Sequence, residues 1–229
     1  MDRLSKKIQG LLTVMTIIVT LFITGGCEHD FYETGDSGLS YLHTDFVEAR
    51  TNTATAFFSA HTDDGVRLTL QPALKTLWAT KGDTTYRALL YYNKVENGVT
   101  EPVAISPVAV LRIRLALDLP PVHTDPVGFE SAWISRDRKY LNLGLKLKTG
   151  KSDDTRAVQS LGIACDSVRR RSSGSRIFYL RLYHRQNGIP EYYSTRVFAS
   201  IPLQNMERQD SVVLDINTYK GKVRKQFAR

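Results

Sequence analysis

The sequence predicts an all-β protein made of two successive β modules. Apolar and polar residues alternate with a period of two along most of the chain, as in half-buried strands. Gly-, Asn- and Asp-containing turn sequences separate the alternating runs, and a helical period is nearly absent. With 229 residues, the chain is long enough for two modules with cores of their own.

The first module is predicted from five short apolar runs. They cover Phe46–Arg50, Ala56–Ala60, Val66–Leu70, Leu89–Tyr92 and Val108–Leu117. The sequence Thr-Asp-Asp-Gly at 62–65 is typical of a turn between the second and third runs. Five short strands suit a small closed barrel of the oligonucleotide/oligosaccharide-binding (OB) type, which removes exposed edges. A sandwich would fit this half nearly as well.

The second module is predicted from clearer alternation. One strand buries four leucines that interleave with Asn, Gly and Lys: Leu141, Leu143, Leu145 and Leu147. A strand with Phe178, Leu180 and Leu182 leads through Gln-Asn-Gly at 186–188 into the run 192–203. Because Asn-Gly supplies the positive φ values of a tight turn, we expect a hairpin there. A last hairpin joins Val212, Leu214 and Ile216 through Lys220-Gly221 to Val223 and Lys225. The pattern is that of an antiparallel β-sandwich.

A proline-rich segment lies between the two halves. Pro120, Pro121 and Pro126 cannot donate to a β-ladder and restrict the residues before them. We therefore predict the barrel over 42–118, a linker over 119–128 and the sandwich over 129–229. A second break, the basic loop 169–175, either meets an anionic surface or is a solvated loop tip.

The N-terminus has the features of an export signal. Arg3, Lys6 and Lys7 precede an uncharged apolar run, Leu11–Ile23, which as a helix would be roughly 20 Å long and too short to span a membrane. Thr24, Gly25 and Gly26 then lead to Cys27, an order that resembles the lipobox of bacterial lipoproteins. The resemblance implies a signal peptide over 1–26, diacylation of Cys27 and a polar tether over 27–41.

Cysteine and charge usage add little further chemistry. If Cys27 carries lipid, Cys165 has no partner in the chain, and its apolar surroundings favour a buried structural thiol over a nucleophile. The net charge of +8 falls by two when the signal is removed. This basic balance favours acidic partners such as anionic glycans or lipid headgroups without specifying one.

The common catalytic and metal-binding motifs are missing. His29, His43, His61, His123 and His184 are scattered, and no Cys-x-x-Cys, Gly-x-Ser-x-Gly or Walker sequence occurs. The carboxylate pairs at 63–64 and 153–154 lie in turn sequences, where Asp serves local backbone hydrogen bonds. We therefore predict no enzyme activity, no cofactor and no metal site. Nucleic acid is not an expected partner for an exported lipoprotein.

Several segments in order resemble a known family. They are the signal with Cys27, the tether motif Gly-Asp-Ser-Gly at 35–38, and the strands Tyr86–Asn93, Trp133-Ile134 with Tyr140–Leu143, Tyr179–His184 and Asp210–Tyr219. Together they resemble the NigD-like lipoproteins of Bacteroidetes across the whole mature chain. The resemblance implies an N-terminal OB domain, a C-terminal β-sandwich and a suggested bacteriocin-associated or immunity role, and it brings no catalytic residues.

Two functions are compatible with these observations. The first is a non-enzymatic envelope lipoprotein, anchored through Cys27 and expected at the outer membrane on its periplasmic or outer face, that binds a protein or peptide partner. The second is a glycan-binding accessory protein that uses tyrosines such as Tyr91, Tyr92, Tyr192 and Tyr193. An exposed stacking platform would favour the glycan, whereas a broad apolar patch would favour a protein.

Overall fold

The computed structural model describes residues 42–119, 121–154 and 156–229, which belong to one compact unit. The predicted signal peptide and tether, with Cys27, lie outside the described residues. Strands dominate, and the only helical element in the described ranges is one 3-10 turn, η2 (Ala116–Asp118). Within these ranges, no helix has the length and apolar character needed to cross a membrane.

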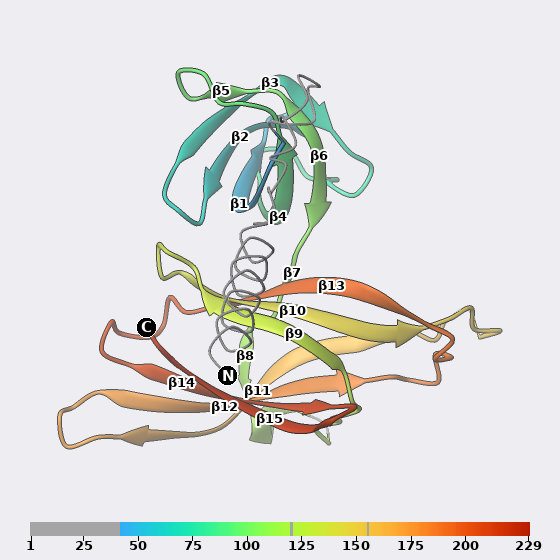
Figure 1. The fold of residues 1–229 in the computed structure, drawn as a ribbon, viewed down its shortest axis with the longest axis vertical. Coiled ribbons are helices and arrows are strands. Elements are labelled where there is room, and N and C mark those ends of the chain that lie inside the picture. Colours follow the sequence, from blue (N-terminus) through green and yellow to red (C-terminus); the bar gives the residue numbers. More distant parts are fainter. Residues whose placement is uncertain (1–41, 120, 155) are drawn as a thin grey trace, which may run out of the picture. The chain divides into compact units, whose positions relative to one another are not determined.

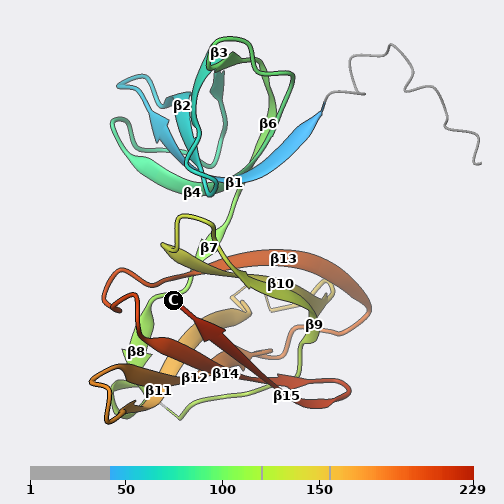
Figure 2. The same ribbon diagram turned by 60° about the vertical axis from the view of Figure 1, so that its left-hand side comes forward.

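The first module is a curved six-stranded sheet that forms a half-barrel, with β5 at one end of the strand order and β6 at the other (Figures 1 and 2). Its strands are β1 (His43–Thr51), β2 (Ala56–Thr62), β3 (Arg67–Lys75), β4 (Thr85–Tyr92), β5 (Val99–Thr100) and β6 (Pro102–Pro107). β5 and β6 are separated by Glu101 alone, yet β5 pairs in parallel with β3 and β6 pairs antiparallel with β4. One bent segment therefore joins the two ends of the sheet. The predicted OB-like barrel is confirmed.

The second module is a sandwich of two sheets. The four-stranded sheet has the order β7 (Ala109–Val110), β13 (Tyr193–Pro202), β10 (Tyr140–Thr149), β9 (Gly128–Ile134). The five-stranded sheet has the order β15 (Gly221–Ala228), β14 (Ser211–Thr218), β12 (Arg176–Arg185), β11 (Ser160–Arg170), β8 (Ile113–Leu115). The predicted sandwich is confirmed, but its pairing is mixed, because β12 and β14 run parallel.

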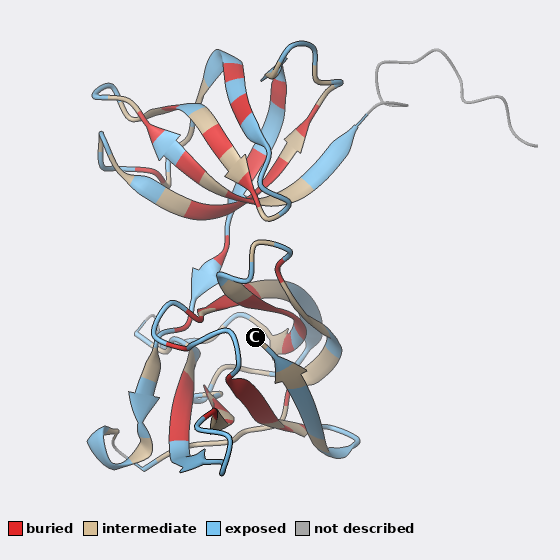
Figure 3. Cartoon of the chain, turned by 90° about the vertical axis from the view of Figure 1, so that its left-hand side faces the viewer, coloured by how far each residue is buried: buried red, intermediate tan, exposed pale blue. Residues whose placement is uncertain are grey.

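The sandwich core is filled by the alternating strands that the sequence indicates. The four leucines of β10 are buried, three of them completely, and they pack with Ile163, Leu180, Leu182, Ile201 and Leu214 from the other strands. In Figure 3, buried residues follow the strands inside each module, while exposed residues gather at turns and outer strands.

The change from barrel to sandwich occurs earlier than the predicted boundary at residue 118. β6 ends at Pro107, and β7 and β8 already pair with β13 and β11 of the sandwich. The run 108–117 is therefore not a barrel strand. Leu111 enters the sandwich core, and its amide donates to the Ser200 carbonyl.

The predicted linker 119–128 also differs from the structure. Residues 123–127 cross the sandwich: the His184 amide donates to the His123 carbonyl, and the Asp125 amide donates to the His184 carbonyl. Val127 is fully buried. Proline removes amide donors but leaves carbonyl acceptors, so a segment with three prolines can still pack against a module edge.

One predicted hairpin is wrong. Asn187 and Gly188 have the expected positive φ values, 51° and 74°. However, the strands they connect, β12 and β13, lie in different sheets, so this turn is part of a crossover between sheets. The turns at 62–65 and 219–220 do connect paired antiparallel strands, as expected.

Candidate functional site

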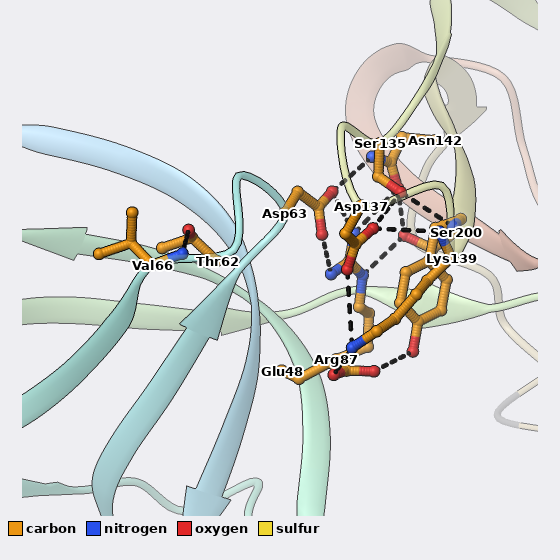
Figure 4. A network of polar contacts seen from close by, with 11 residues as sticks. Glu48, Thr62, Asp63, Val66, Arg87, Ser135, Asp137, Lys139, Asn142 and Ser200 are labelled. Carbon is orange, nitrogen blue, oxygen red and sulfur yellow. Dashed lines mark hydrogen bonds and ion pairs between the residues drawn. The ribbon is translucent and has the colours of Figure 1, made fainter.

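A buried arginine connects the two modules. Arg87 on β4 has a side chain only 2% exposed, and it forms a two-pronged ion pair with Asp63, with Nη1 to Oδ1 at 2.6 Å and Nη2 to Oδ2 at 2.7 Å. Its remaining N–H groups reach the sandwich, with Nε donating to Ser200 Oγ at 3.0 Å and Nη2 to Asn142 Oδ1 at 3.1 Å. Figure 4 shows this network. A charge removed from water needs several such partners, and here it has them.

The burial of Arg87 follows from strand geometry. Ala88 and Leu90 of β4 point into the barrel core, so Arg87 and Leu89 point outward. Both are nevertheless buried, since the outer face of the barrel contacts the four-stranded sheet. Asn142, between the core leucines of β10, faces Arg87 from the sandwich and is completely buried.

A second contact ties the modules together beside the first. Glu48 of β1 accepts hydrogen bonds from Lys139 Nζ and Tyr140 Oη, each at 2.8 Å. Burial acts to raise the pKa of Glu48, but these bonds outweigh it and the pKa is lowered. Burial together with the bond to Glu48 raises the pKa of Tyr140. The Arg87 guanidinium lies 4.0 Å from the centre of the Tyr140 ring, so Tyr140 is held from both sides.

Tyr140 also lines a cavity of about 660 Å³. We call this cavity the sandwich groove. It lies between the β7–β8 segment, the facing parts of β11 and β12, and the residues after β13. Its lining comprises Val110, Arg112, Ile113, Leu115, Tyr140, Cys165, Val168, Phe178, Pro202, Gln204, Asn205 and Met206.

Exposed apolar side chains lie at the border of the groove, whose lining is otherwise mixed and includes Arg112, Tyr140, Gln204 and Asn205. Val110 is 44% exposed, Leu115 56% and Val168 45%, and all three border the same cavity. Leu117, 96% exposed, follows on η2. Apolar side chains gathered around a concavity, in contrast to scattered ones, mark interaction sites. The groove can therefore accept apolar side chains of a ligand.

A second cavity of about 560 Å³ lies between the modules. Phe46 there meets Trp133 and Phe198 edge to face, each at 5.4 Å between ring centres. Most of its charged groups are paired, Asp63 with Arg87, Asp64 with Arg136 and Arg196 with Glu130, and Asp45 accepts a hydrogen bond from Tyr92. The pair with Arg196, followed by the contact with Lys146, lowers the pKa of Glu130 to about 2. This crevice is built mainly from the contacts that join the modules.

The residues singled out from sequence are dispersed. Cys165 is 4% exposed, and burial raises its pKa, as expected for a structural thiol, although it lies in the wall of the sandwich groove. Tyr92 is buried and donates to Asp45, whereas Tyr192 and Tyr193 are 80% and 60% exposed on the sandwich. The four tyrosines do not form one platform.

The histidines and carboxylate pairs are not assembled into a reactive site. His184 is buried with its Nδ1 on the Asp125 carbonyl, and His43 stacks on Tyr92. Asp63 is bound by Arg87 and Asn142, and Asp154 contacts Arg156 in its own loop. In the described ranges, no three His, Cys, Asp or Glu side chains are placed to hold a metal ion.

Sequence reasoning missed Arg87, Asn142 and the groove. The available signals were a charged residue inside the apolar run Tyr86–Tyr92 and an amide inside the leucine strand of β10. Polar residues on the outward face of a strand ordinarily indicate contact with water, so neither signal shows that this face is covered. Nothing in the sequence indicates that β7 and β8 border a cavity with Val168 and Met206.

Comparisons with known proteins identify the fold. Residues 118–228 match the family model of the NigD-like C-terminal beta sandwich domain, which confirms the predicted resemblance. A NigD-like immunity protein from Bacteroides caccae is 22% identical, with a TM-score of 0.64 over 81% of this chain and 96% of that chain. A candidate toxin-related protein from Parabacteroides distasonis is 16% identical, with a TM-score of 0.63 over 82% and 93%.

A candidate lipoprotein from Bacteroides fragilis is 12% identical, with a TM-score of 0.54 over 81% of this chain and 96% of that chain. No curated protein matches the sequence. At these identities the solved structures share the fold of this chain and do not identify a ligand.

Proposed function

Since the C-terminal domain of this chain belongs to the NigD-like family, we propose that the protein is a non-enzymatic lipoprotein of the cell envelope that binds a protein or peptide partner. The sandwich groove carries this proposal. It combines a volume of about 660 Å³ with the exposed apolar side chains of Val110, Leu115 and Val168, and its lining contains one charged residue, Arg112. Such a site binds by burying apolar side chains of a partner.

Binding, and not turnover, is the activity that this groove supports. The groove lining contains one thiol, that of Cys165, which is buried. Burial and the charge of Asp166 raise the pKa of Cys165, whereas a reactive thiolate needs a lowered pKa. Tyr140 is held by Glu48 and Arg87 and has a raised pKa. Neither group is prepared for proton transfer or attack near neutral pH.

An immunity role is the form of this function that the comparisons support, since a NigD-like immunity protein shares the fold. An immunity protein would hold a toxin in a complex and needs no catalysis. The glycan alternative has weaker support, because Tyr92 is buried and bonded to Asp45 on the barrel, whereas the exposed Tyr192 and Tyr193 lie on the sandwich.

The envelope location rests on the sequence from Arg3 to Cys27 and on the similarity to a candidate lipoprotein. We propose attachment to the outer membrane through a diacyl group on Cys27. Labelling with radioactive palmitate should mark the wild type and not Cys27→Ser. A wild-type protein without label would contradict the anchor.

Partner binding can be tested by quantitative affinity purification from envelope extracts. Leu115→Asp places a charge at the groove, and Leu77→Asp places the same charge at a fully exposed barrel position. We expect a partner that co-purifies with the wild type and with Leu77→Asp but is lost with Leu115→Asp. If every co-purifying protein is retained by Leu115→Asp, the groove is not the binding site.

A further inference from the structure

The rim of the sandwich groove carries unbalanced positive charge. The segments that form it, 109–118, 165–178 and 202–211, contain seven arginines and four carboxylates. The arginines are Arg112, Arg114, Arg169, Arg170, Arg171, Arg176 and Arg208. A groove whose border is both apolar and basic differs from the crevice between the modules, where most of the charges are paired.

Three of the four carboxylates are already occupied by cations. Asp210 is buried and bound by Arg176, with Nη2 to Oδ2 at 2.6 Å, and Glu207 contacts the same guanidinium. Asp166 is paired with Arg181. Only Asp118 on η2 lacks a cation partner among the described residues.

Some arginines at the rim of the groove have no carboxylate partner and can bind a ligand. Arg112 lines the groove, and Arg170, two residues after Val168 on β11, shares the strand face of that wall residue. Both are exposed, and neither forms an ion pair with any described residue. Arg169 lies on the opposite face of β11, where its guanidinium is 5.4 Å from the centre of the Tyr179 ring. Arginine offers a rigid fork of donors that fits a carboxylate, so this rim is suited to acidic groups.

We propose that the sandwich groove receives an acidic polypeptide segment of the partner, with apolar side chains inserted beside Leu115 and Val168 and carboxylates bound by Arg112 and Arg170. This inference rests on the proposed function and specifies the chemistry of the partner. A polypeptide fits better than an anionic lipid surface, because a flat membrane cannot fill a concavity, whereas side chains can.

Selection from a library of random displayed peptides tests the proposal with a defined probe. Purified protein is the target, and selected peptides are then measured against three variants. Leu115→Asp disrupts the groove. Arg112→Gln with Arg170→Gln removes the rim charges. Arg50→Gln with Arg67→Gln is the matched control, since these exposed barrel cations also form no ion pair with the described residues.

We expect groove-dependent peptides to be enriched in Asp and Glu together with apolar residues. Their affinity should fall about tenfold or more in the rim variant, stay unchanged in the control and weaken with added salt. Circular dichroism melts of each variant establish that it is folded.

Peptides that require Leu115 but show no acidic bias would overturn this inference and leave the proposed function standing. Peptides that bind equally well to Leu115→Asp would contradict the proposed function as well. If the rim arginines instead bind vesicles of phosphatidylglycerol and phosphatidylethanolamine, and no acidic peptides are selected, the rim is a membrane contact and the proposal fails.

Discussion

At the scale of single residues, the charged and amide side chains between the modules matter most. Arg87 donates to Asp63, Asn142 and Ser200, and three of these four groups are almost completely buried. The fourth, Asp63, has a side chain 15% exposed. Removing one member of such a set leaves the others without partners in a site that water hardly reaches.

Arg87→Met should therefore destabilise the protein by about 3–5 kcal/mol, because Asp63 would stay behind as an unpaired, largely buried charge. Urea unfolding measures the change. Adding Asp63→Asn should restore part of the loss, whereas Arg67→Met, at an exposed barrel position, should change stability by less than about 0.5 kcal/mol. A single Arg87→Met variant as stable as the wild type would mean that the modules do not depend on this ion pair.

Glu48 gives the contact between modules a pH dependence. Burial raises its pKa, but bonds from Lys139 and Tyr140 prevail and lower it below its ordinary value of 4.5. A carboxyl group whose pKa is lower in the folded than in the unfolded protein stabilises the fold at pH values above its pKa in the unfolded protein. That stabilisation is lost as the pH falls through its pKa in the folded protein. The contribution of Glu48 should therefore be complete at neutral pH and decline below pH 4.5.

Comparison of wild type with Glu48→Gln at pH 7 and pH 3 tests this sign. We expect the free energy of unfolding of the wild type to exceed that of Glu48→Gln by roughly 1 kcal/mol at pH 7. This difference in stability should be smaller at pH 3. Glu96→Gln, at a well-exposed pair with Lys94, should show no comparable gap at either pH. A gap that is the same at both pH values would show that the charge of Glu48 has no role.

At the scale of elements, the sequence indicates strands well and their partners poorly. Alternation places β10, β12 and β14 correctly, because one face of each strand is set by the core. Which strands pair depends on contacts distant in sequence: Asn187-Gly188 has the dihedrals of a hairpin turn and yet connects two sheets. β7 and β8 have two and three residues, too few for a period to show.

The segment with β7 and β8 can be tested through two leucines. Leu111 is 6% exposed and part of the sandwich core, whereas Leu117 is 96% exposed. Leu111→Ala should destabilise the protein by about 2–5 kcal/mol through the cavity it leaves. It should also speed hydrogen exchange in β8 and β11, and Leu117→Ala should do neither. Equal effects of the two substitutions would mean that this segment is not anchored in the sandwich.

At the scale of the whole molecule, buried polar contacts hold the two β modules together. The direct connection between β6 and β7 is Val108, which is itself buried, and its amide donates to the Arg87 carbonyl. Proline content pointed to 119–128 as the boundary because prolines favour irregular backbone. Pairing of residues 109–115 with the sandwich instead places the module boundary near residue 108.

Limited proteolysis distinguishes the two boundaries. Leu117 and Pro121 are exposed, so cleavage between them is expected. Because β7 and β8 stay paired with β13 and β11, the two fragments should elute together in gel filtration under native conditions and unfold in one transition. Separation of a folded fragment that begins after residue 121 would support the boundary predicted from the prolines.

The central claim is that the sandwich groove binds a protein partner, and photo-crosslinking in living cells tests it most directly. A photoreactive amino acid replaces Leu115 in one strain and the exposed Leu77 of the barrel in another. We predict a discrete crosslinked adduct from position 115 that is absent at position 77 and is reduced when Arg112 and Arg170 are changed to Gln. No adduct at position 115, or the same adduct from both positions, would contradict the account.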